Sequence, residues 1–259
     1  MRNLFDLTGK VALVTGGSRG IGEMIAEGYV ANGVKTYISA RKVDACNATA
    51  ERLSGQGECI AIPADLSTTE GVSALADEIK SRETRLDVLV NNAGATWGAS
   101  IEEFPENGWD KVMDINVKGP FFLTQALLSL LAASATPEDP ARIINVGSID
   151  GINVNKLGTY SYGPSKAAIH HLTRTLASHL ADRNITANAI APGPFHSKMT
   201  AGVAKAMGNE IRDNVPLRRW GRPGDMAGTA IFLASLASAY ISGAVIPVDG
   251  GIVASSRTL

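Results

Sequence analysis

The chain has 259 residues, 45% of them hydrophobic and 19% charged, which is typical of a soluble globular protein. Its 24 basic and 25 acidic residues balance without a long run of either sign, so we expect no nucleic-acid partner. No secretory signal opens the sequence, and the longest apolar-rich run, 121–135, is interrupted by polar residues and too short to span a bilayer. We therefore predict a cytoplasmic protein with no membrane partner.

Short β-branched runs alternate with segments of amphipathic helical spacing along the whole chain. The apolar residues of these runs are nearly continuous, as expected for strands that are buried on both faces of a parallel sheet. The expected strands are 10–16, 35–40, 58–65, 86–94, 141–148, 185–193 and 244–251. The alternation predicts an α/β fold, a Rossmann-type doubly wound parallel sheet of about seven strands with helices on both faces. No linker rich in Pro, Gly or Ser divides the chain, so we predict a single domain over 1–259.

A glycine-rich turn, TGGSRGIG at 15–22, follows the first expected strand and leads into a helix. Gly16 permits a tight turn, while Gly20 and Gly22 leave room for a pyrophosphate beside the N–H groups of a helix N-terminus. The spacing differs from the commoner GxGxxG pattern. The turn indicates dinucleotide binding, and the alternative is an ordinary strand–helix turn.

Basic side chains stand where an enzyme that uses NAD normally has a carboxylate. The second strand ends in ISARK, with Arg41 and Lys42, and Arg19 lies within the glycine turn. Two guanidinium groups would bind a ribose 2′-phosphate, which a carboxylate would repel. The pattern favours NADP(H), and the alternative is that Arg41 and Lys42 are solvated charges at the start of the next helix.

The third and fourth strands also end in polar residues. Asp65 could accept a hydrogen bond from an adenine amine, or could cap the helix that follows. The segment NNAG at 91–94 suits a backbone that lies close to a ribose, or is a simple turn at the end of a strand.

The segment YSYGPSK at 160–166 holds two tyrosines and one lysine. On a helix, Tyr162 and Lys166 share a face because they are four residues apart, whereas Tyr160 points about 240° away. A cation beside the phenol would lower the pKa of Tyr162 from about 10 toward about 7 and make it a general acid. We therefore expect Tyr160 to line the approach or to pack. The alternative is a helical tyrosine with a surface lysine.

Two further side chains fit this chemistry. Ser148 ends the fifth strand, where its hydroxyl would bind a developing oxyanion, unless it is only a turn residue. Asn116 lies in the middle of a long helix, which is unfavourable without a partner. It could hold a water that links Lys166 to solvent, or could mark a kinked helix.

Together these motifs resemble the short-chain dehydrogenase/reductase family. They lie in the family's order, from TGGSRGIG through Asp65, NNAG, Asn116, Ser148 and YGPSK to APG at 191–193 and a closing SGAVIPVDGG. The resemblance covers nearly the whole chain. It is most similar to 3-oxoacyl reductases of the rhamnolipid-pathway type, which share NNAG-x-x-WGA, YGPSK and RWGRP.

The resemblance implies an NADP(H)-dependent carbonyl reductase that forms a homotetramer through the helices at about 108–134 and 161–181. Its substrate would be a small carbonyl compound, possibly carried as an acyl thioester. The implied catalytic residues are Asn116, Ser148, Tyr162 and Lys166. The implied cofactor-binding residues are Gly16, Ser18, Arg19, Gly20, Ile21, Gly22, Arg41, Asp65, Leu66, Asn92, Ala93, Gly94, Tyr162, Lys166, Pro192, Gly193, Phe195 and Ser197, with Asn91 beside the nicotinamide.

The sequence departs from the family pattern after PG, where Phe195 and Ser197 replace an aliphatic residue and a threonine. We expect Ser197 to bond the carboxamide and Phe195 to narrow the pocket. Residues 194–222 correspond to a lid over the substrate. The expected substrate contacts are Trp97, Asp150, Asn153 and Met199, which could equally be ordinary loop residues.

Two other functions stay open on the sequence. One is a reductase or dehydrogenase for another carbonyl class, such as an aromatic ketone, a sugar or a steroid. The other is a dinucleotide sensor without catalysis. The histidines show no metal-binding spacing, so we expect no metal site.

Overall fold

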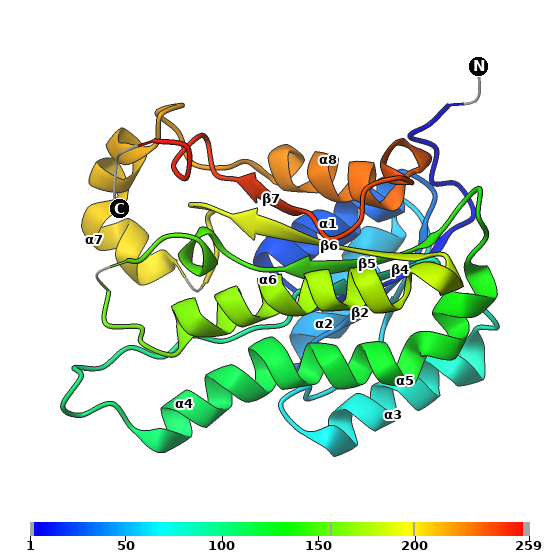
Figure 1. Cartoon of the computed structure of the whole chain (residues 1–259), viewed down its shortest axis with the longest axis horizontal. Coiled ribbons are helices and arrows are strands. Elements are labelled where there is room, and N and C mark those ends of the chain that lie inside the picture. Colours follow the sequence, from blue (N-terminus) through cyan, green and yellow to red (C-terminus); the bar gives the residue numbers. More distant parts are fainter. Residues whose placement is uncertain (1–2, 156, 199, 256–259) are drawn as a thin grey trace.

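All seven apolar runs form strands, and the strands are parallel members of one sheet (Figure 1). The computed structural model describes residues 3–155, 157–198 and 200–255. Each strand is shorter than the run that predicts it, because the residues at the ends of each run belong to loops. The strands are β1 (Val11–Thr15), β2 (Lys35–Ser39), β3 (Cys59–Ala61), β4 (Val88–Asn91), β5 (Ala141–Val146), β6 (Ile185–Pro192) and β7 (Val245–Val248).

The strand order is β3-β2-β1-β4-β5-β6-β7. The order reverses between β1 and β4, which are paired through Ala12 with Val88 and Val14 with Val90. In a doubly wound sheet, ligands bind beyond the carboxyl ends of the strands at this switch point. The fold therefore places the loops after β1 and β4 side by side.

Helices cover both faces of the sheet. They are α1 (Gly20–Ala31), α2 (Val43–Ser54), α3 (Thr69–Arg82), α4 (Glu106–Met113), α5 (Gly119–Ser134), α6 (Tyr162–His179), α7 (Ala201–Asn214) and α8 (Pro223–Ala234). Figure 1 shows α1 and α8 on one side of the sheet, α3 and α5 on the other, and α7 beyond the end of the sheet to which the arrowheads of β6 and β7 point.

The alternation of side chains along β1 explains the two layers. Ala12 and Val14 belong to the core beneath α1, α2 and α8, whereas Val11 and Leu13 belong to the core beneath α3, α5 and α6. All five β1 side chains are buried. Successive side chains of a strand point to opposite faces, so a strand that is covered on both sides must be apolar throughout.

One long helical run joins α4 to α5, close to the helix expected at about 108–134. The two are connected by a π-helical turn, Asp114–Lys118, and together they span Glu106–Ser134. In the part of the chain that the structure describes, this run has a length and composition that would allow it to cross a membrane. However, a core helix of a soluble protein also meets that test, and Leu123, Leu127 and Leu131 of this run are buried in the core.

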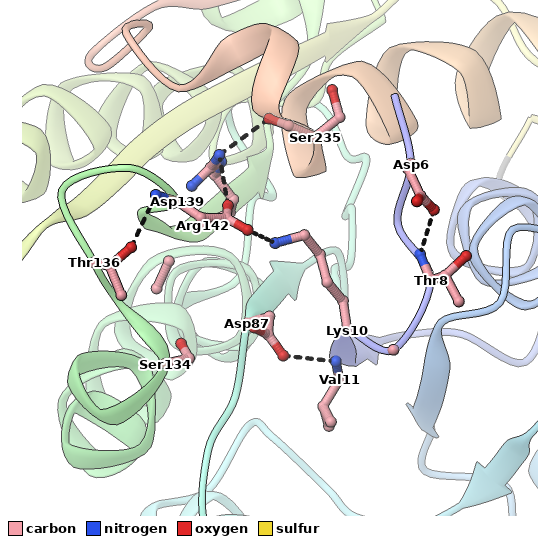
Figure 2. Close-up of polar contacts among 12 residues, drawn as sticks. Asp6, Thr8, Lys10, Val11, Asp87, Ser134, Thr136, Asp139, Arg142 and Ser235 are labelled. Carbon is pink, nitrogen blue, oxygen red and sulfur yellow. Dashed lines mark hydrogen bonds and ion pairs between the residues drawn. The ribbon is translucent and has the colours of Figure 1, made fainter. Parts of the chain in front are cut away.

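A buried ionic cluster closes the amino-terminal edge of the sheet (Figure 2). Arg142 is 1% exposed, and its Nη2 donates to the Ser235 carbonyl at 3.0 Å and lies 3.4 Å from Asp139 Oδ1. Lys10 Nζ lies 2.7 Å from Asp139 Oδ2. Among the described residues, Arg142 Nε and Nη1 have no hydrogen-bond partner. Asp139 therefore contacts both largely buried cations, and the Asp87 carboxylate also favours the charged form of Arg142.

This cluster predicts that substitution of Asp139 lowers the free energy of unfolding more than substitution of Arg142 does. Asp139→Asn should lower the free energy of unfolding by about 2 kcal/mol, because two buried cations lose their counter-charge. Arg142→Met should change it by less than about 1 kcal/mol, because an apolar side chain removes the unpaired donors together with the charge. Urea denaturation measures both, with the exposed Asp182→Asn as control. A larger loss in Arg142→Met than in Asp139→Asn would refute this account.

Candidate active site

The glycine turn after β1 needs glycine at each predicted position. Gly16 and Gly20 have φ values of +65° and +58°. A Cβ atom at Gly22 would lie 2.3 Å from the Gly16 carbonyl oxygen and 2.4 Å from Asn92 Nδ2. The N-cap residue of α1, Arg19, makes no side-chain capping bond. The Arg19 side chain therefore does not occupy the N-terminal N–H groups of α1, a helix of 12 residues. An anion that binds at this helix end needs those N–H groups.

Thr15, which the sequence analysis does not single out, holds this turn against the end of β4. Its hydroxyl accepts hydrogen bonds from the N–H groups of Asn92 and Ala93 at 2.9 and 3.0 Å and donates to the Val90 carbonyl. The Asn92 side chain donates to the Thr15 carbonyl at 2.8 Å. The Asn92 amide is thus part of the scaffold of the turn. The only sequence signal was a hydroxyl residue beside the glycines.

The two arginines lie near the same corner of the sheet. Arg19 is exposed and makes no ion pair among the described residues. The Arg41 side chain is 65% exposed, and its Nη1 lies 3.9 Å from Asp65 Oδ2. Such a long, exposed contact leaves the Arg41 guanidinium available to an anion.

Asp65 does not cap the helix after β3, so that alternative is wrong. Thr68 is the N-cap of α3, and its hydroxyl accepts from Gly71 N at 3.1 Å. Asp65 Oδ1 instead accepts from the N–H and hydroxyl of Ser67. The side chain of Leu66 is buried in the core at 7% exposure, so only its backbone remains for a ligand.

Tyr162 and Lys166 share a face of α6, as the spacing predicts. Lys166 Nζ lies 5.5 Å from the centre of the Tyr162 ring and donates to the Val146 carbonyl at 2.9 Å. Burial lowers the pKa of Lys166 to about 8, against the attraction of Asp150. Tyr160 is 42% exposed and packs edge-on against Phe104 at 5.7 Å, which confirms that it faces elsewhere.

The expected lowering of the tyrosine pKa is wrong for this structure. Burial raises the pKa of Tyr162 to about 12, the Asp150 carboxylate raises it further, and a hydrogen bond with the Ser148 side chain opposes both. Removing the phenol from water disfavours the phenolate more than neighbouring groups favour it. At neutral pH the group is therefore a protonated phenol that can donate.

Ser148 and Asp150 lie on the turn that follows β5, a 3-10 turn over Ile149–Gly151. Ser148 is 7% exposed, and its hydroxyl accepts from Asp150 N at 3.1 Å. Burial raises the pKa of Asp150, against hydrogen bonding by Asn155 and the charge of Lys166. Asn153 is half-buried, and its N–H donates to the Ile149 carbonyl at 2.8 Å. The turn thus places both a hydroxyl and a carboxylate beside Tyr162.

Asn116 lies in the π-helical turn between α4 and α5. Its Oδ1 accepts from Ala95 N at 2.9 Å, and its Nδ2 donates to the Ala95 carbonyl at 3.0 Å and to Ser165 Oγ at 2.9 Å. π-helical turns inside α-helices are frequent at functional sites. The mid-helix asparagine therefore has partners. Its side chain joins the loop after β4 to α6, immediately beside Lys166.

Gly94 opens this junction toward the lysine. A Cβ atom there would lie 3.7 Å from Lys166 Nζ and 3.0 Å from Asn116 Oδ1. Asn91, by contrast, is 4% exposed and donates to Asn145 Oδ1 at 2.9 Å. We expected Asn91 to border the nicotinamide, but its side chain is held inside the sheet.

The loop after β6 reaches the glycine turn. The N–H of Gly193 donates to the Val248 carbonyl at 3.0 Å, which ties the residue after Pro192 to β7. Ser197 borders Gly20, where a Cβ atom would lie 3.3 Å from Ser197 Cβ. The Ser197 and Thr200 hydroxyls are 3.1 Å apart.

Phe195 packs into the core while it also borders a cavity that Pro194, Leu217 and Gly221 line. It is 2% exposed and belongs to the core beneath α1 and α8. A Cβ atom at Gly221 would lie 2.3 Å from Phe195 Cζ, so the ring is packed on that glycine. Only the Phe195 backbone, whose carbonyl accepts from Thr200 Oγ1 at 2.8 Å, is left to line the site.

The expected substrate contacts separate into different environments. Trp97 packs over Gly108 of α4, with Lys111 Nζ 5.1 Å from its ring centre. Asp150 lies beside Tyr162, as described above. Met199 lies outside the described residues.

Comparison with known proteins identifies close relatives of this chain. Residues 16–253 match the family model described as enoyl-(acyl carrier protein) reductase. The chain is 51% identical over 253 residues to the rhamnolipids biosynthesis 3-oxoacyl-[acyl-carrier-protein] reductase of Pseudomonas aeruginosa, covering 97% of this chain and 99% of the relative. It is 37% identical to the 2-dehydro-3-deoxy-D-gluconate 5-dehydrogenase of Dickeya dadantii, covering 97% and 98%.

Solved structures agree with the sequence comparison. The Pseudomonas aeruginosa RhlG/NADP active-site complex superposes with a TM-score of 0.94 at 50% identity, covering 98% of this chain and all of the other. A short-chain type dehydrogenase/reductase from Mycobacterium marinum gives a TM-score of 0.89 at 32% identity, covering 96% and 97%. The resemblance inferred from the motifs is therefore confirmed, and the chain belongs to the short-chain dehydrogenase/reductase family.

Proposed function

We propose that this protein reduces the carbonyl group of a 3-oxoacyl thioester to an alcohol with NADPH. The observation that carries the proposal is the meeting of Tyr162, Ser148 and Lys166 at the carboxyl edge of the sheet, beside a glycine turn shaped for a dinucleotide. A relative that shares half of its residues is a 3-oxoacyl-[acyl-carrier-protein] reductase.

The residues present fit NADPH. A pyrophosphate would lie on the open N-terminus of α1, at the turn formed by Gly16, Gly20 and Gly22, where no Cβ atom intrudes. Arg19 and Arg41 would bind the 2′-phosphate, since both are exposed and neither has a close acidic partner among the described residues. Gly94 and Lys166 would border the nicotinamide ribose.

The protein's own groups carry the proton. The buried phenol of Tyr162 is protonated at neutral pH and donates its proton to the carbonyl oxygen as that oxygen gains charge. The Ser148 hydroxyl donates a hydrogen bond to the same oxygen. Reduced nicotinamide, when bound, supplies the hydride that the carbonyl carbon accepts.

Lys166 acts on the phenolate that remains after this transfer. Its Nζ is 5.5 Å from the Tyr162 ring in a buried site, where a cation stabilises an anion far more than in water. Because its pKa is about 8, the Lys166 ammonium can also return a proton to the Tyr162 phenolate. Asn116 supports this relay by holding Ser165 and the loop after β4 around the lysine.

A second substrate class has specific support. The gluconate dehydrogenase of Burkholderia cenocepacia, solved with NADP and tartrate, superposes with a TM-score of 0.89 at 30% identity, covering 97% of this chain and 98% of the other. A sugar-acid carbonyl would use the same Tyr162 and Ser148. A dinucleotide sensor without catalysis has no such support, because every residue of the proposed tetrad is present.

The surroundings of the site complete the proposal. Residues 194–222, including α7, form the lid over the substrate, and the Trp220 indole anchors α7 by donating to the Gly208 carbonyl at 3.2 Å. Phe121 and Phe122 are 39% and 37% exposed on α5, which supports a homotetramer that pairs this helix. The enzyme acts in the cytoplasm as one domain over 1–259, without a membrane or nucleic-acid partner.

The role of the catalytic tyrosine predicts a sharp loss of turnover. Tyr162→Phe should lower kcat by about 10²–10⁴-fold, because the proton donor is removed, while the Kd of NADPH changes little. Tyr160→Phe is the matched control and should retain most activity, since Tyr160 packs on Phe104. Consumption of NADPH and its fluorescence on binding measure the two effects. Full turnover in Tyr162→Phe would refute the mechanism.

The two exposed arginines, Arg19 and Arg41, predict a preference for NADPH over NADH. Arg41→Asp should raise the Kd of NADPH by about 10–100-fold, because a charge-assisted hydrogen bond to the 2′-phosphate becomes a repulsion. NADH binding should change far less. The exposed Arg183→Asp, at the opposite edge of the sheet, controls for the change in net charge. An unchanged ratio of the two Kd values would contradict the assignment.

The substrate class is decided by direct assay. Oxidation of NADPH should be rapid when a short 3-oxoacyl thioester is the substrate. Oxidation of NADH with the same thioester should be slow. Rapid turnover of a keto-gluconate but not of the thioester would transfer the proposal to sugar acids. Tight NADPH binding without turnover of a broad panel of ketones would leave only the sensor.

A further inference from the structure

A buried histidine on α6 has no part in the mechanism described so far. His170 is 3% exposed and stands four residues after Lys166, which stands four residues after Tyr162. Residues at this spacing share one face of a helix. His170 therefore continues the catalytic face of α6 one turn further toward the interior.

The imidazole ring fills the space beneath the turn that carries Ser148. A Cβ atom at Gly147 would lie 2.0 Å from His170 Nε2, and a Cβ atom at Gly151 would lie 2.8 Å from His170 Cε1. The ring therefore excludes a side chain at Gly147, whereas at Gly151 both the ring and the Lys166 backbone, 2.6 Å from such a Cβ atom, exclude one. The two glycines flank the segment 148–150, and the ring contacts the turn at both ends.

A hydrogen bond ties the ring to one end of that turn. The Gly151 backbone favours the protonated ring, which places its carbonyl beside the imidazole, while Nε2 has no hydrogen-bond partner among the described residues. Burial lowers the pKa of His170 to about 4, and the charges of Lys166 and Arg174 lower it further. The ring is therefore neutral at pH 7 and carries one N–H donor.

Plain core packing does not explain this choice of residue. A buried nitrogen without a partner costs about 1–3 kcal/mol, which an aliphatic side chain of similar size would avoid. A histidine at this site gives what an aliphatic side chain cannot: a rigid plane against Gly147 and a directed bond to Gly151.

We infer that His170 is a positioning residue, which holds the turn after β5 so that the Ser148 hydroxyl stays in bonding distance of the Tyr162 phenol. The inference rests on the proposed roles of Tyr162 and Ser148 and adds a third residue to them. A misplacement of about 1 Å in a catalytic group can cost about 100-fold in rate, so a rigid support for the turn matters.

A double-mutant cycle tests the inference. His170→Leu should lower kcat by about 10–100-fold in the otherwise native chain, with the Kd of NADPH unchanged within about two-fold. In the Ser148→Ala background, the same substitution should lower kcat by less than about three-fold, because the group that it positions is already gone. A residue that only stabilises the fold would lower kcat by the same factor in both backgrounds, and that result would overturn the inference.

Amide variants sharpen the result and guard against a chain that does not fold. His170→Asn keeps a donor near the Nδ1 position and His170→Gln keeps one near the Nε2 position. The amide whose donor reaches the Gly151 carbonyl should retain kcat within about five-fold, and the other should resemble His170→Leu. If His170→Leu does not fold, the cycle is run with the less active amide. Equal activity of the two amides would refute the directed bond.

Two controls separate this inference from the proposed function. Lys80→Leu, at an exposed position on α3, should leave kcat and thermal stability nearly unchanged. Ser148→Ala alone tests the mechanism. Native turnover in that single variant would refute both the role of Ser148 and the inference that His170 positions it. A large loss in Ser148→Ala with no loss in His170→Leu would refute only the role of His170.

Discussion

The site depends on one buried contact, the bond from the Lys166 ammonium to the Val146 carbonyl at 2.9 Å. A buried amine must find a partner, because leaving it unbonded costs several kcal/mol, and β5 offers a free carbonyl at its end. The bond fixes α6 against the carboxyl edge of the sheet. Tyr162, one turn earlier, is then placed over the turn that follows β5, and Ser148 meets it there.

The same burial sets the charges that the chemistry needs. It raises the pKa of Tyr162 and lowers that of Lys166, so the phenol stays protonated and the ammonium releases a proton more easily than in water. A phenol with a pKa near 7 is not required before the substrate reacts. The nearby cation has its largest effect on the phenolate formed afterwards, when opposite charges face each other in a poorly solvated site.

The sequence predicted what local geometry dictates. Seven strands, the glycine turn and the shared face of Tyr162 and Lys166 follow from periodicity and spacing alone. The environments of Phe195 and Leu66 did not, because the direction of a side chain at the end of a strand depends on the element that packs above it. Thr15 was missed for a related reason: its two bonded N–H groups belong to the loop after β4, more than seventy residues later. The pKa of Tyr162 needed the burial of the site, which no short motif contains.

The fold separates chemistry from specificity. Parallel strands present all their carboxyl ends at one edge of the sheet. The reversal of strand order between β1 and β4 brings the loops that follow these two strands together at that edge. These loops are fixed by bonds to the sheet, as Thr15 and Lys166 illustrate. Trp97, an expected substrate contact, packs on Gly108 of α4, and the segment 194–222 is bonded through Leu217 N to the Gly250 carbonyl after β7. A substitution at Trp97 can therefore leave the proton donor and the dinucleotide turn in place, because Lys166 and Asn92 fix them through bonds that Trp97 does not make.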